Sequence, residues 1–399
     1  MKSVLKKTSL LEICTLVTDG THDSPKIQQS GVPFIKGRHI SSGKIDFVNC
    51  DFITEEDHLR CIKRVKPQLY DVLFSNIGSV GDAACVSVDI EFSIKNVALF
   101  RPNSSIVYPK YFYYLVISPY FRGQFLNVRS GSAQPFISLE SFRSLRFDFI
   151  ENKVLQHRIA TILSSYDDLI ENNRRRIQLL EQSARLLYKE WFVSLRFPGH
   201  EHVKITDGVP EGWGRKTLGG LCEEIRESVS PDSVEPDTPY IGLEHLPRRS
   251  IALNEWGTAD QVTSSKHRFR EGEILFGKIR PYFHKVGIAF VDGVASSDAI
   301  VIRPFRDELR AFVLMTVSSD GFVAVTAQTM KEGSKMPRAD WKQMQQYLVP
   351  LPPEGVLAVF NSIIDPILQQ LKTLSFENRN LSKARDILLP RLMSGEITV

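Results

Sequence analysis

The sequence predicts an α+β fold in which two similar globular domains are separated by a long antiparallel helical coiled coil, as an internal repeat with an approximate twofold axis. Two observations predict it. The chain of 399 residues repeats itself once, about 202 residues on (Asp71 to Glu273, 273 − 71 = 202). Each half then closes with a long heptad-patterned segment. A domain and a helix that both occur twice indicate contacts at two separated places.

Three pairs of segments show the repeat. Residues 71–77 (DVLFSNI) return as 273–279 (EILFGKI), 96–102 (NVALFRP) as 298–304 (DAIVIRP), and 131–135 (GSAQP) as 333–337 (GSKMP).

Each copy has a mixed texture. Short β-branched and aromatic runs lie between clusters of Gly, Asp, Asn and Ser, which is typical of an irregular sheet. In the first copy these runs are residues 32–35, 72–74 and 97–100, and Tyr108 to Gln124 is the expected helix.

Two heptad seams follow the mixed regions, with charged residues between the apolar ones, which predicts two long helices. Asn173 fits a polar seam residue that fixes the register. The helices most simply pair with each other, because pairing buries both seams. The pattern alone leaves parallel packing open, whereas antiparallel packing gives the twofold axis. Pro366 is expected to break or kink the start of the second helix. The seam residues are Tyr166, Ile170, Asn173, Ile177, Leu180, Ala184, Leu187 and Trp191, then Phe360, Ile364, Ile367, Leu371, Leu374, Asn378, Leu381, Arg385, Leu388 and Leu392.

These patterns divide the chain into five parts. They are a first domain (1–152), a first long helix (153–196), a linker (197–212), a second domain (213–353) and a second long helix (354–399).

Composition sets broad limits. With 42% hydrophobic and 24% charged residues the chain can bury sizeable cores, and a net charge of +4 permits a nucleic-acid partner without arguing for one. Five scattered cysteines indicate reduced thiols in a cytoplasmic protein. There is no apolar signal core and no run of about 18 apolar residues, so we expect no membrane segment.

No catalytic motif is found. The chain has no GxxxxGK[ST] phosphate loop, no HExxH and no EF-hand pattern. Ile367 follows Asp365-Pro366, so an amino-methyltransferase motif of the aspartate-proline-proline-aromatic type is missing. His200-Glu-His202 lacks a third ligand nearby in sequence and is interpreted as a solvated loop. We expect a binding protein with no catalytic residue, no metal site and no cofactor.

Basic and amide side chains stand in glycine-bounded loops of both halves. Arg and Lys suit guanine edges and phosphates, and Asn and Gln suit adenine edges, although ordinary surface loops remain the alternative. Because Asn76 in the first copy stands where Lys278 stands in the second, two half-sites of different sequence are expected. The candidate DNA-binding residues are Thr21, His22, Lys36, Arg38, Asn76, Gln134, Lys278, Arg280, Tyr282, His284, Lys285, Lys331, Lys335 and Arg338.

The chain resembles the specificity subunits of type I restriction–modification systems over essentially its whole length. The resemblance depends on the order of six segments: Asp19-Gly-Thr-His22, Gly31-Val-Pro-Phe-Ile35, Leu187-Tyr-Lys-Glu-Trp-Phe192, Pro210-Glu-Gly-Trp213, Gly272-Glu-Ile-Leu-Phe276 and Leu388-Leu-Pro-Arg-Leu-Met-Ser-Gly-Glu396.

The resemblance implies two target-recognition domains, a bipartite asymmetric target in double-stranded DNA, and a non-catalytic role. It also implies assembly with two DNA adenine methyltransferase (modification) subunits and with ATP-dependent restriction subunits. One departure is that the first domain lacks a counterpart of Trp213, which leaves its opening strand undecided.

Two other classes of protein stay open. A restriction–modification enzyme fragment would need methyl-donor and amino-methylation motifs, which the sequence lacks. A coiled-coil scaffold without a DNA role would show no DNA binding at any salt concentration, whereas a DNA-binding protein would lose affinity steeply as salt rises.

Overall fold

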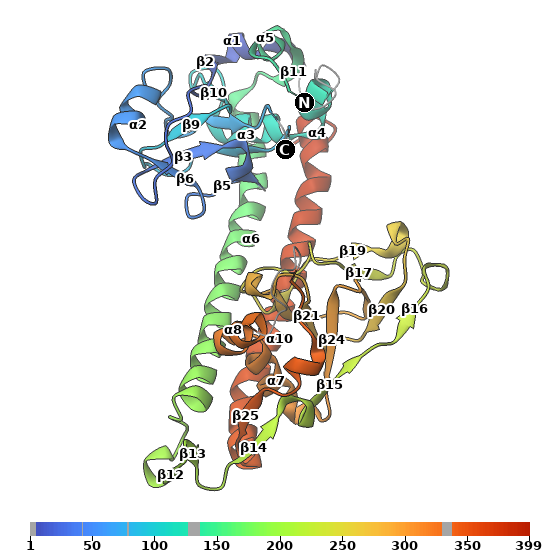
Figure 1. Cartoon of the computed structure of the whole chain (residues 1–399). Helices are drawn as coiled ribbons and strands as arrows, with labels where there is room; N and C mark the ends of the chain where they lie inside the picture. Colours follow the sequence, from blue (N-terminus) through green and yellow to red (C-terminus); the bar gives the residue numbers. More distant parts are fainter. Residues whose placement is uncertain (1–4, 42, 78–79, 127–135, 329–336) are drawn as a thin grey trace. The chain divides into compact units, whose positions relative to one another are not determined.

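A computed structural model describes residues 5–41, 43–77, 80–126, 136–328 and 337–399. Its contacts divide the chain into two compact units, each described here by itself. Unit 1 comprises Met1–Asp168 and Leu381–Val399, and unit 2 comprises Leu169–Asn380. Each long helix therefore gives one part to unit 1 and the other to unit 2 (Figure 1). The five parts expected from the sequence divide the chain differently, and they stay a prediction.

Unit 1 contains a four-stranded antiparallel sheet, β2-β10-β7-β8, and a three-stranded sheet, β6-β3-β9, in which β3 and β9 run parallel. Two-stranded pairs β1-β11 and β4-β5 complete its strands. The strands are β1 (Leu5–Ser9), β2 (Cys14–Asp19), β3 (Val32–Lys36), β4 (Ile40–Ser41), β5 (Lys44–Ile45), β6 (Asp51–Ile53), β7 (Val72–Phe74), β8 (Ala83–Cys85), β9 (Ser93–Lys95), β10 (Ala98–Pro102) and β11 (Arg146–Ile150).

The helices of unit 1 are short. They are α1 (Leu10–Ile13), α2 (Glu55–Cys61), α3 (Pro109–Ile117), α4 (Pro119–Leu126) and α5 (Leu139–Ser144). The single helix expected from Tyr108 to Gln124 is wrong, because the chain leaves the helical conformation at Ser118 (φ −61°, ψ 143°). Pro119 disfavours helical geometry in the residue before it and then starts α4.

Unit 2 contains two five-stranded sheets, β15-β24-β21-β22-β18 and β16-β20-β23-β17-β19, with pairs β14-β25 and β12-β13. The strands are β12 (Ile205–Thr206), β13 (Val209–Pro210), β14 (Gly214–Thr217), β15 (Cys222–Ile225), β16 (Ser228–Val229), β17 (Pro239–Ile241), β18 (Ala252–Leu253), β19 (Gly257–Thr258), β20 (Lys266–Phe269), β21 (Ile274–Gly277), β22 (Val286–Ala289), β23 (Gly293–Ala295), β24 (Ala299–Pro304) and β25 (Leu348–Leu351). The short helices are α7 (Arg310–Val317), α8 (Asp320–Gln328) and α9 (Trp341–Met344).

The repeat is structural as well as sequential. The order β2-β10-β7-β8 of unit 1 returns as β15-β24-β21-β22 in unit 2. The parallel pair β3-β9 returns as β17-β23, and the antiparallel pair β1-β11 returns as β14-β25. Strand β1 is thus the opening strand that the sequence left undecided.

The central strands of both units are buried on both faces. In β7, Phe74 belongs to one hydrophobic cluster and Leu73 to another; in β21, Phe276 and Leu275 divide in the same way. Successive side chains of a strand point to opposite faces, so a sheet with a core on each side needs a continuous apolar run. This explains why Val72-Leu-Phe74 and Ile274-Leu-Phe276 are apolar without alternation.

The two long helices are α6 (Lys153–Tyr188) and α10 (Glu354–Met393). In unit 2, Asn173 Nδ2 donates to Glu377 Oε2 (3.2 Å), and the rings of Trp191 and Phe360 lie 5.9 Å apart. The partner number falls as the α6 number rises, so the two helices run antiparallel, as expected.

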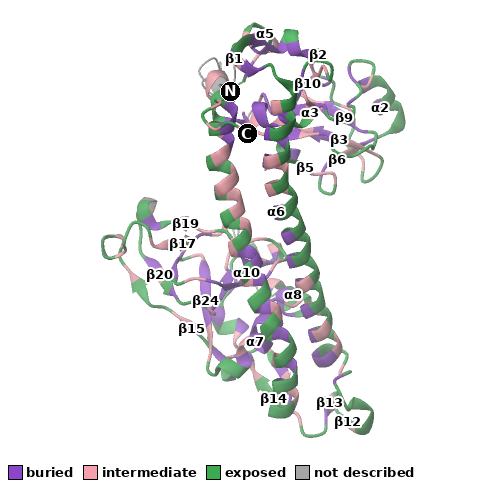
Figure 2. Cartoon of the chain, turned by 180° about the vertical axis from the view of Figure 1, so that it is seen from behind, coloured by how far each residue is buried: buried purple, intermediate pink, exposed green. Residues whose placement is uncertain are grey.

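The seam of α6 and α10 is also confirmed. In unit 1, Arg385 Nη1 donates to Asp167 Oδ1 (2.6 Å). Every predicted seam residue is buried or half-buried, and Figure 2 shows buried and exposed residues alternating along both helices. Asn173 is 6% exposed and holds its expected place as a polar seam residue.

Pro366 does not break the second helix, so the expected break is wrong, while the expected kink stays a prediction. Helix α10 continues from Glu354 to Met393. The exposed Pro366 lies between Ile364 and Leu368, which are buried on the packed side of the helix. Packing on both sides of the proline supports the helix and offsets the missing N–H.

Among the described residues, no single helix has the length and apolar composition to cross a membrane. One bent pair, Asp307–Val317 with Asp320–Gln328, passes that test by length and composition only.

Candidate nucleic-acid interface

Both units place a polar residue directly after a buried central strand. Asn76 follows β7 by two residues and Lys278 follows β21 directly. The backbone around them is the same: the N–H of Ile137 donates to the carbonyl of Asn76 (2.9 Å), and the N–H of Ala339 donates to that of Lys278 (2.8 Å). The repeat therefore presents one backbone position twice, with an amide in unit 1 and an ammonium in unit 2.

In unit 1, the loop after β2 approaches the backbone of β9 closely. A Cβ atom at Gly20 would lie 2.2 Å from the carbonyl oxygen of Ile94, so only glycine fits there. The next N–H, of Thr21, donates to that same carbonyl (3.0 Å). Thr21 is 5% exposed, and its Oγ1 accepts from the N–H of Asp23 (3.1 Å). Thr21 therefore shapes the loop, and its burial argues against the direct DNA contact expected of it.

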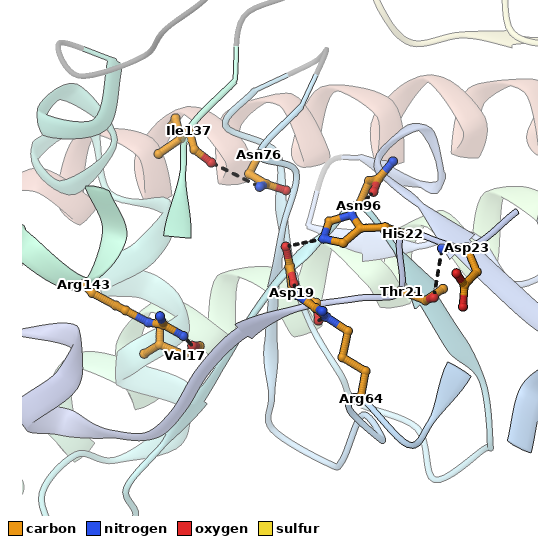
Figure 3. A network of polar contacts seen from close by, with 10 residues as sticks. All are labelled: Val17, Asp19, Thr21, His22, Asp23, Arg64, Asn76, Asn96, Ile137 and Arg143. Carbon is orange, nitrogen blue, oxygen red and sulfur yellow. Dashed lines mark hydrogen bonds and ion pairs between the residues drawn. The ribbon is translucent and has the colours of Figure 1, made fainter. Parts of the chain in front are cut away.

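His22 leaves this loop and lies exposed at its surface. Its Nδ1 lies 2.9 Å from Asn96 Oδ1, and its Nε2 lies 3.3 Å from Asp19 Oδ2 (Figure 3). The other oxygen of the Asp19 carboxylate, Oδ1, accepts a hydrogen bond from Arg64. We call Asp19, His22 and Asn96 the first-half network. It presents an imidazole and an amide, which can both donate and accept hydrogen bonds.

Lys36 and Arg38 share one carboxylate. Lys36 Nζ lies 2.8 Å from Asp51 Oδ2, and Arg38 Nη2 lies 2.6 Å from Asp51 Oδ1. Partial burial opposes ionisation of Asp51, but the hydrogen bond from Lys36 and the two positive charges hold its pKa below the ordinary value. The three residues carry a net positive charge, and Arg38 is exposed.

Asn76 is 5% exposed. Its Nδ2 donates to the carbonyl of Ile137 (3.2 Å), as Figure 3 shows. Among the described residues, its buried Oδ1 has no hydrogen-bond partner. Such an orphaned acceptor is unusual inside a protein. Its burial argues against direct base contact by Asn76 in the conformation described.

In unit 2, the equivalent position is cationic. Lys278 Nζ donates to the carbonyl of Ser297 (3.0 Å) and lies 3.8 Å from Glu224 Oε1. Burial lowers the pKa of the Lys278 ammonium below its ordinary value, with Glu224 opposing that shift. The other oxygen of Glu224 pairs with Arg226 (2.6 Å).

Arg338 completes this group of charges. The Nη2 atom of Arg338 lies 3.2 Å from Asp298 Oδ1, and the backbone of Arg338 pairs with that of Ile279 in an isolated β-bridge. We call Arg226, Lys278 and Arg338 the basic cluster. Three cations here lie against two carboxylates, Glu224 and Asp298, and Arg226 and Arg338 are largely exposed.

A strained loop follows the basic cluster. Arg280 (φ 51°) and His284 (φ 56°) are both left-handed, on either side of the short 3₁₀ helix Pro281–Phe283. Non-glycine residues rarely adopt this conformation, which clusters at functional positions. The N–H of Arg280 donates to the carbonyl of Pro337 (2.9 Å), which holds the loop in place.

The loop exposes two of its predicted residues and buries a third. Arg280 and Tyr282 are exposed, whereas His284 is 5% exposed. His284 Nε2 lies 2.7 Å from the carbonyl of Ser318. Burial lowers the pKa of the His284 imidazole. His284 therefore holds the loop against α8, and its burial argues against the predicted DNA contact.

The remaining predicted residues divide in two. Lys285 is half-buried, its Nζ donates to the carbonyl of Leu243, and burial lowers its pKa. Gln134, Lys331 and Lys335 lie outside the described residues.

Sequence reasoning missed three residues. Arg226 comes directly after β15, at the end of the strand that corresponds to β2, which ends at Asp19. Asn96 comes directly after β9. The Arg248 guanidinium stacks on the Phe283 ring at 4.0 Å. Asn96 has a left-handed φ of 51°, and asparagine accepts this conformation more readily than most residues. Aligning the ends of the repeated strands would have found the first two.

Comparisons with known proteins agree with this geometry. Residues 5–182 match the family described as type I restriction modification DNA specificity domain. The chain is 22% identical to the type I restriction enzyme MjaIX specificity subunit of Methanocaldococcus jannaschii, over 96% of this chain and 91% of that protein. It is 24% identical to the HindI specificity subunit of Haemophilus influenzae, over 82% and 86%. The chain is therefore similar to the type I restriction enzyme specificity subunits.

A solved structure supports the fold. The crystal structure of the type I restriction–modification S subunit from M. genitalium matches with a TM-score of 0.59 at 16% identity, covering 98% of this chain and 96% of that one. The expected resemblance and the α+β fold class are confirmed. The relatives are named specificity subunits rather than catalytic ones, in line with the expected non-catalytic role.

Proposed function

We propose that the chain is the DNA-recognition subunit of a type I restriction–modification complex and binds a bipartite, asymmetric target. One observation carries the proposal: the same backbone position occurs in both units with different side chains, Asn76 in one and Lys278 in the other. Two related folds whose strand ends carry different polar groups suit two half-sites of different sequence. The repeat and the antiparallel α6 and α10 support a fixed spacing between the half-sites.

Each unit offers exposed or half-buried polar groups of the kind that contact DNA. In unit 1 these are His22, Asn96 and the Lys36–Arg38 pair, which would contact base edges and phosphates. In unit 2 they are the basic cluster with Arg280 and Tyr282. A guanidinium can bind the two acceptors of a guanine edge, and an exposed cation neutralises phosphate.

The proposal includes protein partners, namely two DNA adenine methyltransferase (modification) subunits and ATP-dependent restriction subunits. Exposed apolar side chains on α6 and just after it support a protein-binding face. Leu179, Leu186 and Val193 are 54%, 61% and 61% exposed and stand seven residues apart, hence on one face. Methylation would come from the partners, because the relatives are named for specificity.

Mapping of methylated adenines in the host genome tests the bipartite target directly. We expect two short, different sequences separated by a spacer of constant length. A single uninterrupted sequence would contradict the proposal, and absence of DNA binding at low salt would favour the scaffold alternative.

An Arg280→Ala variant tests which unit reads which half. The variant should bind a target with an intact second half-site about 1–3 kcal/mol more weakly, with a salt dependence reduced by about one log–log unit. On targets with a scrambled second half-site, the variant should bind as tightly as the natural chain. Equal loss whichever half-site is scrambled would contradict the assignment.

A matched insertion tests the spacing. Seven residues added between Asp167 and Asn173, and seven between Glu377 and Arg385, add two helical turns to both helices while keeping the seam in phase. At ~1.5 Å per residue this adds roughly 10 Å, so the preferred spacer should lengthen by about three base pairs at ~3.4 Å each. An insertion in α10 alone is the control, since it disrupts the pairing. An unchanged spacer in the double insertion would reject the role of the helices.

A further inference from the structure

A cluster outside the candidate interface brings a buried histidine against two carboxylates. Glu55 and His58 stand three residues apart on one face of α2, and Glu91 lies just before β9. Their ligand atoms all lie within 4.8 Å of one another. All three residues belong to unit 1.

The state of His58 distinguishes this cluster from an ordinary group of surface acids. His58 is fully buried at 0% exposure, and its Nδ1 lies 2.8 Å from Ser93 Oγ. Its Nε2 faces Glu91 Oε2 at 3.4 Å, yet among the described residues it has no hydrogen-bond partner. A buried ring nitrogen without a hydrogen-bond partner lowers the stability of the folded state. The contact between His58 and Glu91 alone does not satisfy this nitrogen.

The distance between His58 and Glu91 fits a shared cation. Two ligand atoms each about 2.0–2.2 Å from a tetrahedral zinc ion lie about 3.4 Å apart, because the tetrahedral angle fixes their separation. The Nε2–Oε2 distance is 3.4 Å. In the tautomer whose Nδ1–H donates to Ser93 Oγ, the Nε2 lone pair faces the carboxylate, and a cation between them would remove that repulsion. The Nδ1–Ser93 bond is the kind of outer contact that orients a metal-bound histidine.

Glu91 uses its two oxygens for two different neighbours. Its Oε1 pairs with Lys66, and the hydrogen bond and charge of Lys66 lower the pKa of the Glu91 carboxyl. Oε2 is the separate oxygen that faces His58, so Lys66 does not fill the position between the histidine and the two glutamates. One imidazole nitrogen and two carboxylates favour a borderline divalent ion over calcium or magnesium, which prefer oxygen alone.

We propose that Glu55, His58 and Glu91 bind one zinc ion that fastens α2 to the start of β9. Strand β9 also supports the first-half network, because Ile94 accepts from Thr21 and Asn96 follows directly. The site is structural and adds no chemical step. It goes beyond the proposed function and does not depend on it. No local spacing indicates this site, since Glu91 lies 33 residues from His58 (91 − 58 = 33).

Calorimetric titration of the metal-stripped full chain with zinc chloride tests the proposal. The informative variant is Glu55→Gln, because Glu55 is exposed and its loss leaves the core intact. The matched control is Glu56→Gln, which removes the same charge from the next residue of α2, where Glu56 pairs with Arg60 at 3.7 Å. We expect Glu55→Gln to bind zinc at least about tenfold more weakly and Glu56→Gln to bind as the natural chain does.

Two further measurements complete the test. Zinc should raise the unfolding temperature of the natural chain and of Glu56→Gln more than that of Glu55→Gln. The cobalt-substituted chain should show the strong visible absorption of a four-coordinate nitrogen–oxygen site. Equal zinc affinity in the two variants would place the ion elsewhere, for example at His200-Glu-His202, and overturn the proposal. Absence of zinc binding to the natural chain would overturn it as well.

Discussion

The two units carry the same sheets but present different chemistry at the same position. Asn76 is buried in unit 1 and its side-chain Oδ1 has no hydrogen-bond partner among the described residues, whereas Lys278 in unit 2 is half-buried and faces Glu224. Around them, the first-half network combines an imidazole, an amide and a carboxylate, while the basic cluster combines three cations. The comparison shows that strand order and core are preserved while the loop ends diverge, because loop side chains contribute little to the core.

The largest expected effect comes from placing the unit 2 residue in unit 1. Asn76→Lys puts an ammonium into a position that is 5% exposed, and burial of an ion costs several kcal/mol. We expect the free energy of unfolding of unit 1 to fall by roughly 3 kcal/mol or more, measured by urea denaturation. An unchanged stability would show that the two positions have the same surroundings.

The reverse exchange should affect binding rather than folding. Lys278→Asn removes a cation from the basic cluster, and we expect binding to a target with an intact second half-site to weaken by about 1–3 kcal/mol. Binding through the first half-site should be unaffected. Lys216→Asn, an exposed lysine on β14 of the same unit, is the control. A similar loss of binding in both variants would mean that only the overall charge of the protein matters, and not the position of Lys278.

A pair of variants at Asn96 separates hydrogen bonding from backbone strain. Both Asn96→Ala and Asn96→Gly remove the contact with His22, but only alanine is strained at a φ of 51°. We expect equal loss of first-half-site affinity, with alanine less stable than glycine by about 1 kcal/mol. If glycine binds like the natural chain, the amide has no part in recognition.

The smallest expected effect is a pH dependence of folding. Burial lowers the pKa of His284, and also those of His267 in unit 2 and His39 in unit 1. Below about pH 6.5 the unfolded chain binds protons that the folded chain refuses, so stability falls as the pH falls through this range. Between pH 7.5 and 5.5, above the range where carboxylates titrate, the unfolding temperature should drop, and His284→Asn should drop less. Asparagine suits the left-handed backbone there. An equal drop would exclude His284 as a source.

Much of the fold followed from local patterns. The runs at 32–35 and 72–74 became β3 and β7, and the seam through Ile170, Ile177 and Leu371 is buried as expected. The helix from Tyr108 to Gln124 failed because Pro119 divides it, and the break at Pro366 failed because packing outweighed the proline. The candidate site was less predictable: Thr21 and His284 have suitable chemistry, but the fold buries both.

The amino-acid order alone determined the duplication, the two paired helices and the strands at their centre, because periods of two and of three and a half residues are properties of neighbouring positions. Tertiary structure decided which polar groups remain available. In the folded chain Lys36 and Arg38 both contact Asp51. Arg226 and Lys278 both lie against Glu224, and Glu91 lies beside His58. These partners come from distant parts of the chain. Their burial and charge are fixed only when the sheets pack, so no local pattern records them.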